Sequence, residues 1–419
     1  MKRLTISVTS LLVLVLLISV AVSAQPQTEF TIWTKEGEVT GGVLEEIENL
    51  AQEFSRTRPG LTIEVVSYGV EELRQDFQAA AFAGQGPDLL WTVSDHAGPF
   101  VAMEIIKPVD DVFEAEFLAG FVRPGLESVE LSGQTWGVPI SVGNHLMLLY
   151  NKNLLPEAPQ NTDEMIKVGQ ELTIDFDNDG MPDQYGLVYN LTEPFFFAPW
   201  LGGFGGWPLD GVTPTLNTPA MVEALRFVQD LKFSHKIVPV ECDYDAADAL
   251  FKEGKAAMLI NGDWSLADYL APEVAEKVDL GIARIPLVSE TGLWPAPMTS
   301  GIYFMLPDYI DGEKEAIAKE FIEFISTDEV QILFLEKHMR LPATEAALEH
   351  PSLTADPILK GSADQMTVGK PMPTVPEMRA AWDAIRPNLE AIMAGKMTPE
   401  AAAQAMQEAA EKLIREMYK

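Results

Sequence analysis

The chain has 419 residues, which is enough for two or three domains and a sizeable core. Hydrophobic residues make up 47% of it and charged residues 22%, a composition that excludes a disordered or fibrous protein. The formal net charge of -34 repels phosphate backbones and anionic lipid, so nucleic acid and membrane surfaces are poor candidate partners.

The N-terminus reads as a secretory signal peptide covering residues 1–24. Lys2 and Arg3 precede an apolar run from about Val8 to Val22, and small residues end at Ala24. An uncleaved anchor is disfavoured because the run is short for a bilayer span. We therefore expect an exported mature chain, periplasmic or extracellular. Its single cysteine, Cys242, excludes an internal disulfide framework.

Strand and helix patterns alternate along the mature chain. Apolar residues recur at helical spacing in 41–60, and Thr398 caps a C-terminal helix with Pro399 in its first turn. Strands are predicted at 29–34, 61–68, 87–93, 255–261, 280–287 and 300–307, and further helices at 71–86, 221–233 and 247–254. This alternation predicts an α/β protein with a largely parallel sheet covered by helices, and the length favours two lobes.

Motifs of the usual catalytic kinds are absent from the sequence. It contains no G-x-S-x-G, no H-E-x-x-H, no Walker loop and no G-x-G-x-x-G, and its five histidines are scattered. These absences favour a binding protein over an enzyme.

The segment "DFDNDGMPD" is typical of a calcium loop. It places Asp175, Asp177 and Asp179 at alternate positions, with Asp183 further on, so hard oxygen ligands gather around a tight turn. Gly186 stands where a full EF-hand has a bidentate glutamate. Two interpretations stay open: a structural Ca²⁺ site, or a solvated turn whose aspartates cap backbone amides.

The segment "TEPFFFAPWLGGFGGW", residues 192–207, combines aromatic rings, glycines and one carboxylate. Pro199 and the glycine pairs break helical and strand periods, so we expect part of the run in a loop or at a surface. Sugar rings require flat aromatic platforms with carboxylates at the edges, and Glu193 beside Phe195 provides that pairing. An ordinary aromatic core with Glu193 at its edge is the alternative.

From Phe30 to its C-terminus, the chain resembles the maltose/maltodextrin-binding proteins, the extracellular receptors of bacterial ATP-driven sugar importers. "YNKNLLP", "INGDW" and "PMPTVPEM" carry the resemblance most specifically, together with "GQGPDLLWTVSDHAG" and "AAWDAIRP". The resemblance implies a two-lobed periplasmic-binding-protein fold with a hinge and an interlobe cleft. It implies a first lobe of residues 25–142 plus 283–326 and a second of 143–282 plus 327–419. A monomer that captures malto-oligosaccharides and delivers them to a membrane permease is expected.

Ligand-binding residues follow from the same resemblance. Asp95 and Glu193 match acidic acceptors of sugar hydroxyls, Phe195 an aromatic position, Trp264 and Trp382 two aromatic platforms, and Arg386 a polar ligand one turn after Trp382. Lys35 and Glu36 lie where the family offers a charged pair, although this loop does not align residue by residue. The full predicted set is Lys35, Glu36, Trp91, Asp95, Asn144, Glu193, Phe195, Trp264, Trp382 and Arg386.

The chain departs from the family pattern on the first-lobe side. His96 replaces an arginine and is expected to be an exposed neutral imidazole, Thr92 replaces a stacking tryptophan beside Trp91, and Asn144 replaces a carboxylate. These changes leave the length and linkage of the sugar open, so a receptor for trehalose or another oligosaccharide is the alternative. A secreted glycosidase using Glu193 and Asp95 is the contrasting class, and no required carboxylate spacing is visible for it.

Overall fold

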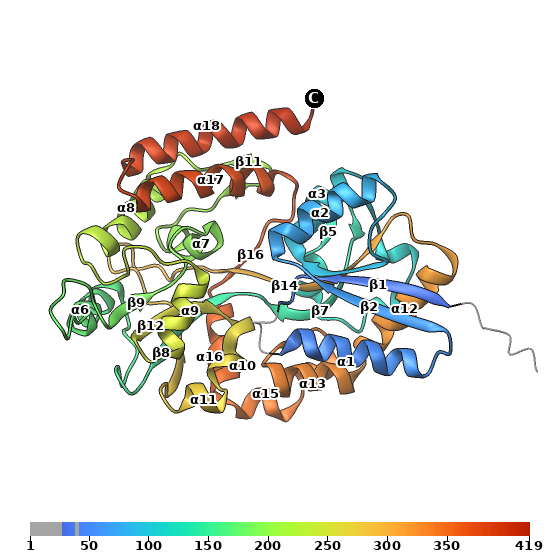
Figure 1. Ribbon diagram of the computed structural model, residues 1–419. Coiled ribbons are helices and arrows are strands. Elements are labelled where there is room, and N and C mark those ends of the chain that lie inside the picture. The colour runs from blue at the N-terminus through green and yellow to red at the C-terminus, as the bar shows by residue number, and fades with distance from the viewer. Residues whose placement is uncertain (1–26, 38–41) are drawn as a thin grey trace, which may run out of the picture.

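The computed structural model describes residues 27–37 and 42–419; the predicted signal peptide, residues 1–24, lies outside the described residues. Two β-sheets, each flanked by helices, form two lobes that lie side by side (Figure 1). The predicted two-lobed α/β fold is therefore confirmed. No helix in the described ranges is both long and apolar enough to cross a bilayer.

The first lobe is built on the larger sheet. Its strand order is β15-β7-β14-β3-β1-β2, and β4 and β16 also pair with β14. The pairs β1–β2 and β1–β3 are parallel, whereas β14 runs antiparallel to β3 and β7. Three of the seven strand pairings in this sheet are parallel and four are antiparallel, so the prediction of a largely parallel sheet is wrong. Three of the antiparallel pairings involve β14, which returns from the other lobe in the opposite direction. The strands are β1 (Thr28–Thr34), β2 (Leu61–Ser67), β3 (Leu89–Val93), β4 (Ile106–Lys107), β7 (Val138–Gly143), β14 (Met298–Pro307), β15 (Leu341–Pro342) and β16 (Lys370–Pro371).

The second lobe contains a smaller sheet of order β13-β8-β12-β9. Here β12 is parallel to β9 and antiparallel to β8. Its strands are β8 (Leu146–Asn151), β9 (Tyr185–Val188), β12 (Ala256–Gly262) and β13 (Leu280–Ala283). A short hairpin of β10 (Leu209–Asp210) and β11 (Thr213–Pro214) belongs to this lobe, whereas the hairpin of β5 (Glu130–Leu131) and β6 (Gln134–Thr135) packs on the first lobe. The fully buried β12 is apolar from Ala256 to Ile260, as expected for a strand covered on both faces.

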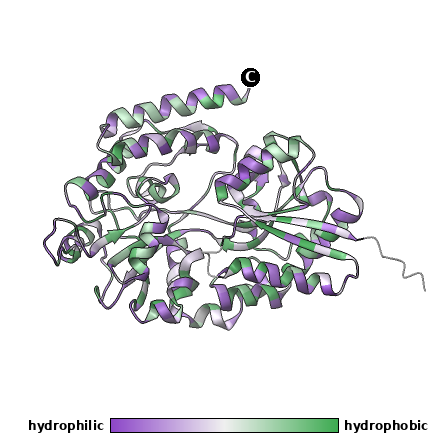
Figure 2. Cartoon of the chain, viewed as in Figure 1, coloured by the Kyte–Doolittle hydropathy of each residue, from purple (hydrophilic) through white to green (hydrophobic). Residues whose placement is uncertain are grey.

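Helices cover the sheets with one apolar face each. In α1, Ile47, Leu50, Ala51 and Phe54 are buried at helical spacing. The predicted cap of α18 is confirmed, because Thr398 Oγ1 accepts the Ala401 N–H at 3.3 Å. Both helices show alternating hydrophobic and hydrophilic bands (Figure 2).

The longer helices are α1 (Val43–Arg56), α2 (Val70–Phe82), α6 (Thr162–Leu172), α7 (Pro194–Gly203), α8 (Pro219–Phe233), α9 (Tyr244–Lys252), α12 (Gly312–Ile325), α13 (Asp328–His338), α16 (Pro357–Met366), α17 (Glu377–Met393) and α18 (Pro399–Met417). The shorter ones are α3 (Ala97–Ala102), α4 (Ala115–Leu118), α5 (Arg123–Glu127), α10 (Leu266–Tyr269), α11 (Pro272–Ala275), α14 (Glu345–Leu348) and α15 (Pro351–Ala355).

Residues 194–203 of the aromatic run form helix α7, whereas 192–193 and 204–207 lie outside it, so the expectation that part of the run lies in a loop is confirmed. Phe196, Phe197 and Trp200 are at most 5% exposed, and Pro199 lies inside the helix. A helix that is hydrophobic all round is stable when protein surrounds it on every side. Most of the run is therefore core, and only its N-terminal end reaches the space between the lobes.

The chain crosses between the lobes more than once, and some elements contact both. Between β7 and β8, Gly143 has φ +117 and Asn144 φ +43. The Asp263 carboxylate accepts the N–H groups of Asn144 at 3.1 Å and His145 at 3.3 Å, which ties this crossing to the second lobe. In α13, Phe334 packs in the first-lobe core and Leu335 in the second. The residue ranges of the two lobes remain a prediction.

Candidate ligand-binding cleft

A cavity of about 330 Å³ lies between the lobes. Several of its residues lie at the ends of strands: Lys35 directly follows β1 and Asn144 directly follows β7. Asp95 lies two residues past β3 and Trp264 two residues past β12. Ligands of open α/β sheets bind beyond the carboxyl ends of strands. The lining residues are Lys35, Val70, Glu71, Val93, Asp95, Asn144, Asn190, Glu193, Phe195, Phe196, Tyr244, Trp264, Met372, Trp382 and Arg386.

Eight of the ten predicted ligand residues line this cavity. The structure brings together Lys35, Asp95, Asn144, Glu193, Phe195, Trp264, Trp382 and Arg386, which are scattered over more than 350 positions in the sequence.

Trp91 does not reach the cavity, so its prediction as a ligand residue is wrong. It lies in the middle of β3, is 1% exposed and packs edge-on against Phe304, with ring centroids 5.0 Å apart. Its ring also contacts Phe334 and belongs to the first-lobe core.

Glu36 is also absent from the lining, and the prediction is corrected for it too. Its carboxylate lies 3.0 Å from Lys35 Nζ and 3.1 Å from Arg340 Nη2, and all three side chains are at most 7% exposed. Burial lowers the pKa of Lys35, opposed by the charge of Glu36. Glu36 therefore compensates the Lys35 ammonium, and Lys35 alone faces the cavity.

His96 is buried, contrary to the expectation of an exposed imidazole. It is 1% exposed, its Nδ1 lies 2.7 Å from Thr92 Oγ1, and its ring packs on Phe100. Burial lowers the pKa of His96 to about 3, assisted by the positive charges of Arg74 and Arg379. The imidazole is consequently neutral at physiological pH, as predicted.

Asp95 is the first-lobe carboxyl of the cavity. Burial raises its pKa to about 6, and the negative charge of Glu71 adds to this shift. The Trp382 indole of the second lobe lies close to the same carboxyl and opposes this rise in pKa. The Asp95 carboxylate has little water around it and can accept a hydrogen bond from a neutral hydroxyl group.

An aromatic wall on the second lobe faces this carboxyl. We define it as Phe195, Phe196, Tyr244 and Trp264. The Phe195 and Trp264 ring centroids are 6.1 Å apart, and those of Phe196 and Tyr244 are 6.3 Å apart. Trp264 Nε1 donates to the Tyr244 hydroxyl at 3.0 Å, which fixes the tilt of the indole. The sequence prediction missed Phe196 and Tyr244, since nothing local distinguishes them from core aromatics.

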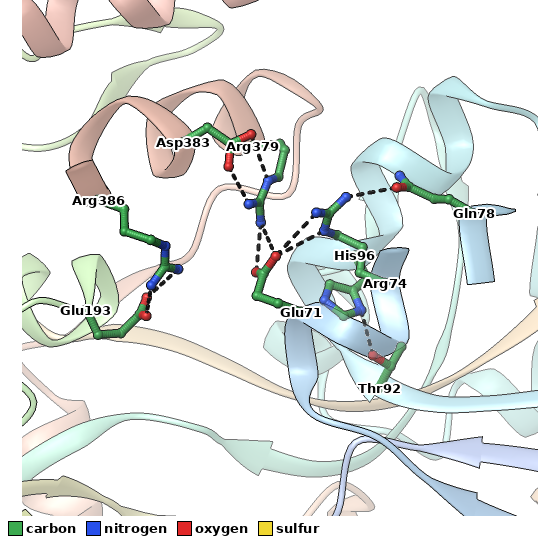
Figure 3. A network of polar contacts seen from close by, with 9 residues as sticks. All are labelled: Glu71, Arg74, Gln78, Thr92, His96, Glu193, Arg379, Asp383 and Arg386. Atoms are coloured by element: carbon green, nitrogen blue, oxygen red, sulfur yellow. Dashed lines mark hydrogen bonds and ion pairs between the residues drawn. The ribbon is translucent and has the colours of Figure 1, made fainter. Parts of the chain in front are cut away.

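Glu193 and Arg386 form an ion pair within the second lobe (Figure 3). Arg386 Nη2 donates to Glu193 Oε1 at 3.0 Å, and Nη1 contacts the other oxygen. Glu193 precedes α7 and Arg386 lies in α17, so the pair also links these two helices. About a third of each side chain stays exposed, which leaves both groups able to contact a ligand.

The acidic loop at 175–183 lies apart from the cleft. Carboxylate oxygens of Asp175, Asp177 and Asp183 all lie within 4.8 Å of one another, close enough for one Ca²⁺ to contact all three. Asp179 lies outside this group and its carboxylate accepts the Met181 N–H at 2.8 Å, so Asp179 as a metal ligand stays a prediction. The Asp175 carboxylate also accepts backbone N–H groups, as a turn without metal does.

The chain is similar to known solute-binding proteins over most of its length. Residues 49–361 match the family model described as bacterial extracellular solute-binding protein. The structure is similar to the maltose/maltodextrin-binding domain of Bdellovibrio bacteriovorus bound to maltotriose, with 42% identity, a TM-score of 0.88, and coverage of 93% of this chain and 100% of that one.

Two further relatives are more distant. The Thermus thermophilus maltotriose-binding protein, bound with maltotriose, is 27% identical with a TM-score of 0.82, over 92% of this chain and 100% of that one. The maltotriose-binding protein of Pyrococcus abyssi is 26% identical over 84% of this chain and 75% of its own length.

Proposed function

The chain belongs to the bacterial extracellular solute-binding protein family, and from this premise we propose that it captures malto-oligosaccharides in the interlobe cleft. The observation that carries the proposal is the pairing of the aromatic wall with Asp95, Lys35 and the Glu193–Arg386 pair in one cavity. Aromatic faces pack on the C–H faces of a glucan, and the charged groups accept and donate at its hydroxyl rim. Three similar proteins whose names include maltotriose support this ligand class.

Delivery to a membrane permease and a monomeric state complete the proposal. Membership of an extracellular family supports an exported protein, and hinge closure around the sugar gives a permease a form that differs from the empty one. No catalytic step is assigned to the cleft. We also propose Asp175, Asp177 and Asp183 as the holders of one structural Ca²⁺.

Isothermal titration with maltose, maltotriose, maltotetraose, trehalose and a galactooligosaccharide tests the ligand class. Saturable binding confined to the malto-series supports the proposal. Trp264→Ala removes one face of the wall and is expected to weaken binding about 10-fold to about 100-fold, which corresponds to about 1.4 to 2.8 kcal/mol of stacking and buried area.

Trp207→Ala is the matched control, because Trp207 is a partly exposed second-lobe tryptophan outside the cavity. Equal losses in both variants, or tight binding of trehalose without malto-oligosaccharides, overturn the assignment. Maltotetraose should be recovered intact after prolonged incubation; shorter products would indicate an enzyme instead.

A further inference from the structure

An ion pair joins the two lobes beside the cavity. Arg379 lies in the first turn of α17 in the second lobe, and Glu71 lies in the first turn of α2 in the first lobe. Arg379 Nη1 donates to both carboxylate oxygens of Glu71, at 2.7 and 2.6 Å (Figure 3). The two residues are 308 positions apart, so only the approach of the lobes brings them together.

Each member of this pair also has a partner in its own lobe. Arg379 Nε donates to Asp383, one turn later in α17, at 3.1 Å. Glu71 accepts from Arg74 Nε and Nη2 in α2, both at 3.3 Å, and Arg74 is itself held by Gln78 at 2.9 Å. When the lobes separate, both side chains therefore keep a charged partner and their orientation, so closing orders few additional rotamers.

The surroundings of the pair set its strength. The Arg379 side chain is 15% exposed and that of Glu71 40% exposed, so the pair lies between a surface ion pair and a buried one. Surface pairs contribute little and are screened by salt, whereas desolvation strengthens attraction between charges. We expect a shift of severalfold in an equilibrium rather than an on/off switch.

Arg379 itself does not line the cavity, but its neighbour on the same helix face does. Trp382 follows three residues later, lines the cavity and lies close to Asp95 of the first lobe. The first turns of α17 therefore meet the first lobe at two points, Arg379 on Glu71 and Trp382 on Asp95. Because Arg379 and Trp382 lie on the same helix, the ion pair that holds Arg379 on α2 also keeps the Trp382 ring next to Asp95.

We propose that Arg379 is a positioning residue which forms, with Glu71, an electrostatic latch that holds the cleft closed. The proposal rests on the proposed sugar-binding function for its kinetic consequence, namely slow release of the sugar. The latch does not need the sugar to form, because neither of its charges comes from a ligand. It therefore also raises the fraction of sugar-free protein that is closed. Because the closed form is the one that holds the sugar tightly, a larger closed fraction raises the apparent affinity for the sugar.

Stopped-flow measurement of maltotriose dissociation tests the kinetic consequence. Arg379→Gln is expected to speed dissociation about 3-fold to about 10-fold and to leave the association rate near that of the wild type, as most interface changes do. Arg379→Lys should restore most of the slow release, since it keeps the charge. Arg123→Gln is the control, because Arg123 pairs with Glu127 within one exposed helix and should change neither rate.

Salt and a double mutant separate the latch from a direct sugar contact of Glu71. Raising NaCl from about 0.1 M to about 1 M shortens the Debye length from about 10 Å to about 3 Å, which should speed release from the wild type but not from Arg379→Gln. In a Glu71→Gln background, Arg379→Gln should have little further effect. Equal salt responses of both proteins, or fully additive effects, overturn the latch.

A measurement without sugar keeps this test independent of the proposed function. Spin labels at Gln75→Cys in α2 and Glu408→Cys in α18, both exposed positions, report the distance across the mouth in a Cys242→Ser protein. Arg379→Gln should shift the sugar-free distances to longer values even if no malto-oligosaccharide binds, in which case the latch stands and the ligand assignment fails. An unchanged distribution in a protein that does bind maltotriose overturns the latch alone.

Discussion

Gly98→Ala tests whether closure of the cleft depends on a close approach of two backbones. Gly98 lies in α3 of the first lobe, next to the segment 374–376 that leads into α17. A Cβ at this position would lie 2.1 Å from the Thr374 carbonyl oxygen and 2.9 Å from Pro376 N. Real Cβ contacts are essentially never shorter than 3.0 Å, and the obstacle is backbone, so no rotamer change relieves it.

The overlap must be relieved by moving the two lobes apart by about 1 Å at this point, since close-packed interiors yield little. Overpacking of this kind costs about 1 to 3 kcal/mol. The cost falls on the closed form, so the affinity for maltotriose should fall about 5-fold to about 150-fold, at about 1.4 kcal/mol for each factor of ten. Titration calorimetry measures the affinity, and circular dichroism verifies that the variant is folded.

Gly120→Ala is the control, because Gly120 is exposed and its added Cβ would meet only the Phe117 carbonyl oxygen, at 3.3 Å. It should bind maltotriose like the wild type. A folded Gly98→Ala protein with wild-type affinity would refute the reasoning, since segment 374–376 could then not pack on α3 when sugar is bound.

Three further predictions concern stability. The pKa of Asp95 is raised from 3.8 to about 6 by burial and by Glu71, so its contribution to the free energy of unfolding is present below about pH 4 and is lost as pH rises through about 6. Asp95→Asn should therefore stabilise the sugar-free protein at about pH 8 by about 1 to 3 kcal/mol and have no effect at about pH 4; thermal unfolding at both pH values checks this, and equal shifts at both would contradict it. Excess Ca²⁺ should raise the melting temperature of the wild type, by about 2 to 4 °C for each kcal/mol of binding free energy. Asp177→Asn should abolish the increase while Asp179→Asn keeps it, and a chelator-insensitive melting curve would count against the site. Glu36→Gln leaves the buried charges of Lys35 and Arg340 uncompensated and should cost about 3 to 5 kcal/mol in urea unfolding, whereas Glu320→Gln, which breaks the exposed pair with Arg58, should cost under about 1 kcal/mol. Similar losses in these two variants would argue against the buried triad.

Local sequence was sufficient to predict a structural feature wherever that feature depends only on residues close together in the chain. The cap of α18 by Thr398 depends on contacts within three residues, and the apolar spacing of α1 depends on one helix turn. Asp95 and Trp264 were predicted as ligand residues because the motifs that contain them match those of a known family, and both line the cavity. These signals are short-range, so a single sequence contains them.

Long-range packing decided the rest. Trp91 and Trp264 are both tryptophans in segments that match the family, yet Trp91 packs on Phe304 in a core and Trp264 lines the cavity. The aromatic run of α7 is helical because protein surrounds it, against its proline and glycines. The pairing of Glu71 with Arg379 and the approach of Gly98 to Thr374 join segments about 300 residues apart. Sequence alone determined the family, the class of fold and most groups of the site, because these depend on local pattern; the tertiary structure decided which side chains face the cleft and what holds it closed, because these depend on contacts between distant segments.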